Sequence, residues 1–75
     1  MFSNVNGEKI DNFTINGNER ISDQTIILFT EKKLSQKINE NDLNDIIKNL
    51  YKTNFFSDVT VNFNNNILNI TVVEN

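Results

Sequence analysis

The sequence lacks several residue types on which common protein functions depend. Its 75 residues include no cysteine, histidine, proline or tryptophan and only two glycines. Without cysteine there can be no disulfide, thiolate zinc site or cysteine nucleophile. Without histidine, the side chain most often used as a general base and as a metal ligand is missing. We therefore expect no catalytic residue, no metal site and no cofactor in this chain.

An excess of positive charge and long apolar stretches are missing as well. Seven basic residues against ten acidic ones give a net charge of −3, and an acidic surface repels the phosphate backbone of nucleic acids. No apolar run approaches the roughly 18 residues of a membrane-spanning helix, and the opening residues MFSNVNGE contain no apolar signal-peptide core. We therefore expect a flexible segment, residues 1–7, and one small domain, residues 8–75, with no nucleic-acid partner and no direct membrane insertion.

The strongest periodic pattern lies in the middle of the chain. Apolar side chains at i, i+3, i+4, i+7 and i+8 form one stripe of a helix; they are Leu43, Ile46, Ile47, Leu50 and Tyr51. Asn39 is a good N-cap for this helix, and Asn54 suits the left-handed conformation in which many helices end. A similar pattern predicts an earlier helix that begins after the N-cap Ser22 and fades at Lys32-Lys33, where cations suit the helix dipole.

Alternating apolar and polar residues predict three strands, at residues 9–16, 57–63 and 67–73. Phe13 and Ile15 of the first strand face inward, whereas Ile10 has the wrong parity and either marks an irregularity or packs where the strand begins. The third strand is mostly apolar, which is typical of a central strand, and the second carries the polar residues typical of an edge. We therefore expect an α+β fold in the order β-α-α-β-β, with a three-stranded mixed sheet, the third strand central, and two antiparallel helices on one face.

Few side chains outside this framework suggest chemistry. Asp42 and Asp45 are close enough on the second helix to suggest a metal or acid pair, but a solvated helix face near the positive helix end is the simpler interpretation. Tyr51 and the Phe55-Phe56 pair form a candidate aromatic patch for a partner, and Phe55 and Phe56 are the candidate aromatic corner. Since consecutive residues between a helix and a strand cannot both point inward, we expect one phenylalanine to be buried and the other exposed.

Three stretches of the sequence together resemble the POTRA (polypeptide-transport-associated) family: FTINGNERISDQTI, NDLNDIIKNLYKTNFFSDVTV and LNITVVEN. The most specific phrase runs from Leu50 to Val59, and the resemblance covers residues 8–75. The sequence departs from the family pattern at Asn54, where glycine is usual, and in the connection 35–37, where a glycine is common. The resemblance implies the POTRA fold and is strongest to the POTRA domains of an outer-membrane protein assembly factor, in particular the first domain of the array.

The resemblance also implies a function, a location and partners. Such a domain lies at the periplasmic face of the Gram-negative outer membrane as part of a larger membrane-anchored chain. It binds unfolded outer-membrane proteins, accessory assembly lipoproteins and neighbouring POTRA domains. Two alternatives within the family stay open, a division-site scaffold of the FtsQ type and a two-partner secretion transporter. A third alternative, outside the family, is a small enzyme of ferredoxin-like architecture. Such an enzyme needs an arginine anchor or a histidine base, and the chain has no histidine and a single arginine, Arg20.

The expected edge strand is the candidate protein-binding site, and it comprises Ser57, Asp58, Val59, Thr60, Val61, Asn62 and Phe63. The unpaired N–H and C=O groups of a sheet edge are a template for an added strand, which needs no fixed sequence. Asp58 is expected to discourage self-association of this edge. If the N–H of Thr60 faces solvent, Thr60→Pro would remove one edge donor without emptying the core. The corner at Phe55-Phe56 is the next candidate.

Overall fold

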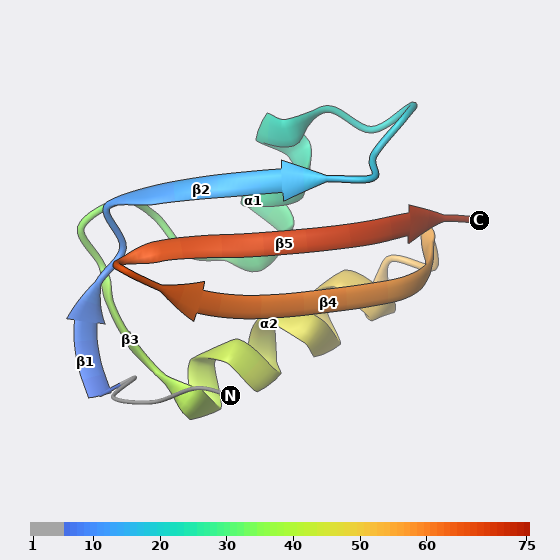
Figure 1. Ribbon diagram of the computed structural model, residues 1–75. Coiled ribbons are helices and arrows are strands. Elements are labelled where there is room, and N and C mark those ends of the chain that lie inside the picture. The colour runs from blue at the N-terminus through green and yellow to red at the C-terminus, as the bar shows by residue number, and fades with distance from the viewer. Residues whose placement is uncertain (1–5) are drawn as a thin grey trace.

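The computed structural model describes residues 6–75, which form two helices and five strands (Figure 1). In chain order the elements are β1 (Asn6–Lys9), β2 (Asn12–Asn16), α1 (Asp23–Thr30), β3 (Lys37–Asn39), α2 (Glu40–Lys52), β4 (Phe56–Asn64) and β5 (Ile67–Glu74). The predicted order is present in β2, α1, α2, β4 and β5, so the predicted fold class is confirmed. The short strands β1 and β3 were not predicted.

Strands β2, β5 and β4 form a three-stranded sheet in that order (Figure 1). The central strand β5 runs parallel to β2 and antiparallel to β4, as its apolar composition predicted. Alternation along β5 buries Leu68, Ile70 and Val72. Because a central strand is paired along both sides, its backbone groups are satisfied within the sheet, and the two edges are left to β2 and β4.

Asparagine and threonine side chains line the face of the sheet away from the helices. Thr14 Oγ1 donates a hydrogen bond to Asn69 Oδ1, and Asn69 Nδ2 donates to Asn62 Oδ1 at 3.0 Å. One row of polar side chains therefore crosses β2, β5 and β4. This row gives several of the chain's asparagines a role in the sheet, because polar cross-strand pairs stabilise neighbouring strands.

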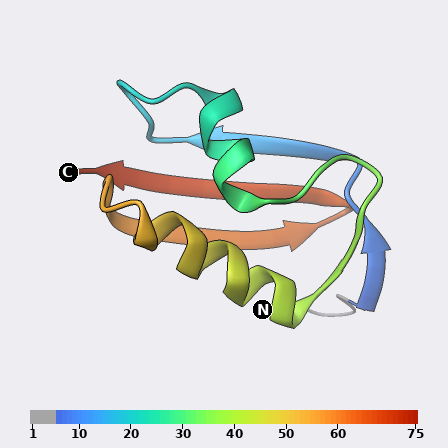
Figure 2. The same cartoon turned by 180° about the vertical axis from the view of Figure 1, so that it is seen from behind.

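Both helices cover the other face of the sheet, with α1 beside β2 and α2 beside β4 (Figure 2). The apolar stripe of α2 buries Leu43, Ile46 and Leu50 completely. Ile47 and Tyr51 lie at the border of this stripe, and Ile47 is half-buried while Tyr51 is 40% exposed. The core between sheet and helices consists of Ile10, Ile26, Ile38, Leu43, Ile46, Leu50, Phe56, Val59, Val61, Phe63, Leu68, Ile70 and Val72.

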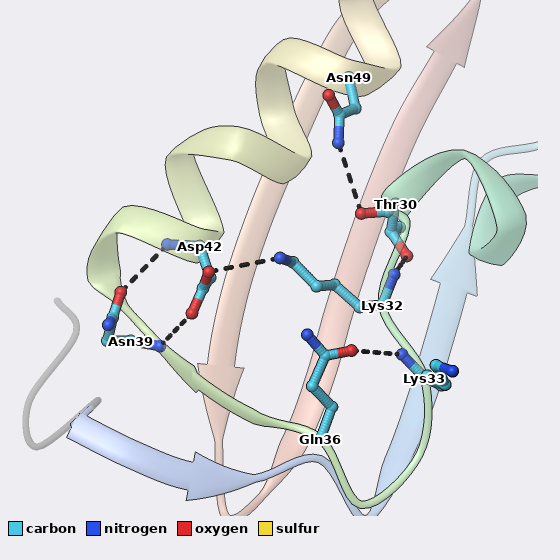
Figure 3. Close-up of polar contacts among 7 residues, drawn as sticks. All are labelled: Thr30, Lys32, Lys33, Gln36, Asn39, Asp42 and Asn49. Atoms are coloured by element: carbon cyan, nitrogen blue, oxygen red, sulfur yellow. Dashed lines mark hydrogen bonds and ion pairs between the residues drawn. The ribbon is translucent and has the colours of Figure 1, made fainter.

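Side-chain caps begin both helices at the predicted residues. Ser22 Oγ accepts a backbone N–H from the first turn of α1 at 3.2 Å. At α2, Asn39 Oδ1 accepts the Asp42 N–H at 3.2 Å, and Asp42 Oδ2 accepts the Asn39 N–H at 2.8 Å (Figure 3). Asp42 Oδ1 also pairs with Lys32 Nζ at 3.3 Å. Asp42 therefore has a structural role at the helix start, and its partner in the candidate acid pair, Asp45, is exposed on the helix surface.

The first helix ends at Thr30, before the expected position at Lys32-Lys33. Glu31 adopts a left-handed φ of 60°. The buried Thr30 hydroxyl donates to the Ile27 carbonyl at 2.6 Å. Figure 3 shows that Asn49 Nδ2 of α2 donates to the Thr30 carbonyl, at 3.5 Å. These two contacts, the second of which joins α1 to α2, fix the end of the helix at Thr30. The favourable position of the two lysines for the helix dipole gives no sign of either contact.

The strands β1 and β3 pair antiparallel outside the main sheet. Ile10, which follows β1, and Ile38, within β3, are 0% and 1% exposed. Of the two possibilities for Ile10, the structure thus supports packing at the start of the strand. In the predicted flexible segment, residues 1–5 lie outside the described residues, and the last two, Asn6 and Gly7, belong to β1.

Asparagines in the left-handed region form two of the sharp turns. Asn54 has a φ of 65° directly after Thr53, the C-cap of α2, as predicted from its sequence context. Asn65 and Asn66 have φ values of 52° and 63° and connect β4 to β5. Positive φ at both central residues is the signature of a type I′ turn, whose twist matches that of the two strands it joins.

Two substitutions at Asn54 test the left-handed helix end. Asn54→Gly should be neutral or stabilise the domain by up to about 1 kcal/mol, because glycine has no Cβ to crowd the backbone at positive φ. Asn54→Val should destabilise it by about 1–2 kcal/mol, because a β-branched residue is strained there. The Asn54 side chain is exposed, so neither change disturbs the core. Urea unfolding compares the variants, and equal stability would contradict the assignment.

Candidate functional site

The predicted binding strand lies at a free edge of the sheet. All candidate residues from Ser57 to Phe63 fall within β4, and within residues 6–75 the only strand that pairs with β4 is β5. The side chains that β4 directs into the core are Phe56, Val59, Val61 and Phe63. Asp58 and Thr60 are exposed on the opposite face. Within residues 6–75, the side of β4 away from β5 therefore has no strand paired to its main-chain groups.

Only every second residue of β4 directs its N–H and C=O toward the free edge, because backbone direction alternates along a strand. Asn64 and Ile67 flank the two-residue turn, and residues that flank such a turn bond to each other across the hairpin. Val59 N–H bonds to a side chain outside the sheet. Both observations give the same phase: Val59, Val61 and Phe63 face the free edge, and the even-numbered residues face β5.

Thr60 accordingly directs its N–H toward its partner Thr71 on β5 rather than toward solvent. The condition under which Thr60→Pro would probe the edge is not met, because proline here would remove a bond of the β4–β5 ladder. Side-chain alternation in the sequence shows which face a residue occupies. It does not show which edge its N–H faces, since this depends on which side of the strand the neighbour lies.

Tyr51 covers part of the free edge. Its hydroxyl oxygen accepts the Val59 N–H at 3.0 Å and lies 3.5 Å from Asp58 Oδ1. Among the hydrogen bonds outside the ladder in residues 6–75, none involves the backbone groups of Val61 or Phe63. The sequence placed Tyr51 in the helix stripe and in the aromatic patch. The only hint of this contact was the polar hydroxyl of a tyrosine at the border of the stripe.

The aromatic corner consists of one buried and one exposed phenylalanine. Phe56 is 4% exposed and Phe55 is 50% exposed, which answers the question that the sequence left open. The Phe55 ring lies 5.9 Å from that of Phe29 and 6.4 Å, edge-on, from that of Phe56. A bulge between Phe56 and Asp58 shifts the alternation of β4. Phe55 is therefore supported on two sides and still offers a face to solvent.

A second apolar surface, which the sequence analysis did not identify, lies between α1 and β2. Leu28 and Leu34 are 75% and 58% exposed, and together with Phe13 they line a groove of about 660 Å³. The other lining residues are Ile27, Glu31, Lys32 and Lys33. Leu28 lies between two positions of α1 that are buried, Ile26 and Thr30, so its exposure follows from helical geometry, but the groove depends on how α1 sits on the sheet.

Backbone amides hold the end of β5 in place. The Glu74 carboxylate accepts the N–H groups of Glu19, Arg20 and Ile21, at 3.0 Å from Arg20 and 3.2 Å from Ile21. The bond from Glu19, with those from Ile21 and Arg20, lowers the pKa of the Glu74 carboxyl below its ordinary value, and partial desolvation opposes this shift. The loop after β2 is thereby tied to the C-terminal end of the central strand.

Two further observations concern metal binding and membrane spanning. Among residues 6–75, no group of three or more histidine, cysteine, aspartate or glutamate side chains is placed to hold a metal ion. Neither of the helices in this part of the chain is long and apolar enough to cross a bilayer.

Comparisons with known proteins agree with the fold. The POTRA family model, described as "Surface antigen variable number repeat", matches residues 8–75, which is nearly the whole chain. A search of curated proteins finds no match. The order of the main elements, the mixed sheet with β5 at its centre and this match agree, and the chain belongs to the POTRA family.

Proposed function

We propose that this domain is a protein-interaction module of an outer-membrane β-barrel assembly machine of the BamA type, at the periplasmic face of the outer membrane. POTRA domains mediate protein–protein interactions, including those with neighbouring domains, and occur in periplasmic parts of outer-membrane-associated proteins. The proposed partners are unfolded outer-membrane proteins, accessory assembly lipoproteins and adjacent POTRA domains. The domain acts by binding and not by catalysis.

The free edge of β4 is the observation that carries this proposal. Val61 and Phe63 direct their backbone groups away from β5, and their side chains are 4% exposed and locked in the core. A partner strand can therefore pair with rigid, preformed main-chain groups. A chain that will become a β-barrel is extended and alternates apolar with polar residues. Main-chain hydrogen bonds can bind such a chain without requiring a particular sequence.

The charge and the size of this edge favour weak, reversible binding. The net charge of −3 keeps the free domain soluble, and Asp58 places a carboxylate beside the edge, which discourages pairing between two copies. Few backbone groups are open at the edge, so each bound strand gains only a few hydrogen bonds of about 0.5–1.5 kcal/mol each. Weak binding suits the transfer of a client from one domain to the next.

The phrase from Leu50 to Val59 favours the assembly-factor type over a division-site scaffold or a two-partner secretion transporter. In the structure this phrase contains the end of α2, the left-handed Asn54, the exposed Phe55 and the start of β4. This stretch therefore connects α2 to the start of the β4 edge. The proposed array position is the first of several POTRA domains.

Peptide titration followed by NMR tests the proposal. We expect an extended peptide of alternating valine and threonine, with a lysine at each end for solubility, to shift the amide signals of Val61 to Phe63. Shifts confined to β2 would contradict strand addition to β4 and indicate binding at the other edge of the sheet. Shifts confined to the groove lined by Leu28 and Leu34 would also contradict it and indicate binding in that groove.

A matched pair of variants at Val61 separates the edge donor from the core side chain. Val61→Ala keeps the edge N–H and removes most of the side chain, and it should still bind the peptide. Val61→Pro also disturbs the core but removes the N–H, and it should bind about 3- to 10-fold more weakly. Equal affinity of two folded variants would show that the β4 edge does not carry the binding.

A further inference from the structure

The hydroxyl group of Tyr51 occupies a backbone donor that an added strand would need. Tyr51 is in the last turn of α2, and its hydroxyl oxygen reaches the Val59 N–H at 3.0 Å. Val59 is one of the residues whose N–H faces the free edge. Within residues 6–75, the edge of β4 is therefore divided, with its beginning occupied by the Tyr51 side chain and its continuation at Val61 and Phe63 open.

Asp58 orients the hydroxyl group for this task. The Tyr51 oxygen accepts a hydrogen bond from Val59 N–H, so its own proton is free to point elsewhere. The Asp58 carboxylate lies 3.5 Å away, a long contact that draws the hydroxyl proton toward the negative charge. With its proton so directed, the oxygen presents a lone pair to the amide. The tyrosine therefore acts as a fixed acceptor in place of the carbonyl of a neighbouring strand.

We propose that Tyr51 sets the register and the length of the strand that β4 accepts. This inference rests on the proposed function, strand addition to β4. A partner that extends past Val61 to Val59 must displace the hydroxyl group, and it then exchanges one hydrogen bond for another with little net gain. The partner therefore pairs at Val61 and Phe63 and stops there.

The occupied donor also selects against longer regular strands. Two copies of β4 that paired edge to edge would need the whole row of outward groups, including that of Val59. The Tyr51 hydroxyl already occupies the Val59 N–H in each copy. The two Asp58 carboxylates add repulsion between like charges. The favoured partner is thus a short extended segment of a flexible chain, rather than the complete edge of another folded sheet.

The variant Tyr51→Phe tests the inference because it removes the hydroxyl and keeps the ring on the domain surface. We expect the Val59 amide to exchange with solvent about 3- to 10-fold faster in this variant, as one hydrogen bond of ordinary strength is lost. The amides of Leu68 and Ile70 in the central strand serve as the internal reference for global stability. Unchanged exchange at Val59 would overturn the inference.

Two alternating valine–threonine peptides with terminal lysines then measure the register. The short peptide can span Val61 to Phe63, and the long one can reach Val59 as well; extension the other way gains no pairing, because the turn begins at Asn65. The native domain should bind both with nearly equal affinity and show no shift of the Val59 amide. Tyr51→Phe should bind the long peptide about 3- to 10-fold more tightly than the short one.

The outcomes separate this inference from the function on which it rests. If the native domain already prefers the long peptide and its Val59 amide shifts, Tyr51 does not set the register, although strand addition to β4 stands. If the variant gains no preference for the long peptide, the inference also fails alone. If neither peptide shifts β4 in either protein, strand addition itself fails, and the register proposal fails with it.

Discussion

Replacing Leu50 by alanine should lower the free energy of unfolding by about 2–5 kcal/mol. Leu50 is fully buried where α2 meets the sheet, so the shorter side chain loses apolar burial and leaves a cavity that its neighbours fill only in part. A domain of this size has a total stability of about 4–11 kcal/mol, and a substantial share of it depends on this one side chain. Urea unfolding followed by circular dichroism gives the difference, provided that the m-value is unchanged.

The same substitution at Leu28 is a matched control. Leu28 is also in a helix but is 75% exposed, so Leu28→Ala removes little buried surface, and alanine is at least as good a helix former. We expect a change within about 0.5 kcal/mol. A loss below about 1 kcal/mol at Leu50, or equal losses at the two positions, would show that the buried face of α2 is assigned incorrectly.

Gly17→Ala should destabilise the domain by about 2–5 kcal/mol, through backbone strain and a steric clash together. Gly17 has a φ of 89°, and a Cβ atom built there would lie 2.0 Å from the carbonyl oxygen of Val72. Val72 belongs to the central strand, which cannot move without disturbing its pairing with β2 and β4. Thermal or urea unfolding measures the loss of stability, and two-dimensional NMR shows whether shifts concentrate along β5.

Gly7 separates the two causes of this effect. Its φ is 74°, also positive, but a Cβ atom there would meet nothing within 4 Å. Gly7→Ala should therefore carry only the cost of the left-handed backbone, about 1–2 kcal/mol. If Gly17→Ala proved no more harmful than Gly7→Ala, the close approach of the loop after β2 to the central strand would be refuted.

Signals that depend on a few neighbouring residues predicted the local structure well. The apolar stripe, the cap at Asn39 and the left-handed Asn54 placed α2 correctly because each is decided within about one helical turn. The apolar composition of residues 67–73 identified the central strand, because a strand flanked on both sides is more enclosed than an edge strand and tolerates fewer polar residues. The family match over residues 8–75 agrees with these local predictions.

Features that depend on contacts between distant elements were missed or assigned wrongly. The strands β1 and β3 are too short for a periodic pattern, and they exist because they pair with each other. The end of α1 at Thr30 depends in part on a contact with Asn49 in α2. The groove beside Leu28 and the choice between Phe55 and Phe56 as the buried ring likewise depend on how packed elements are placed.

By itself, the sequence determined the type, order and most of the boundaries of the main elements, and it identified β4 as an edge strand, because propensity, capping and alternation act over short distances. Only the tertiary structure decided which backbone groups of that edge are open. Side-chain alternation orients residues toward the core or solvent, but the direction of an N–H depends on the side on which β5 pairs. The contact from Tyr51 to Val59 depends on the position of α2 across the strand, and no local pattern encodes that position.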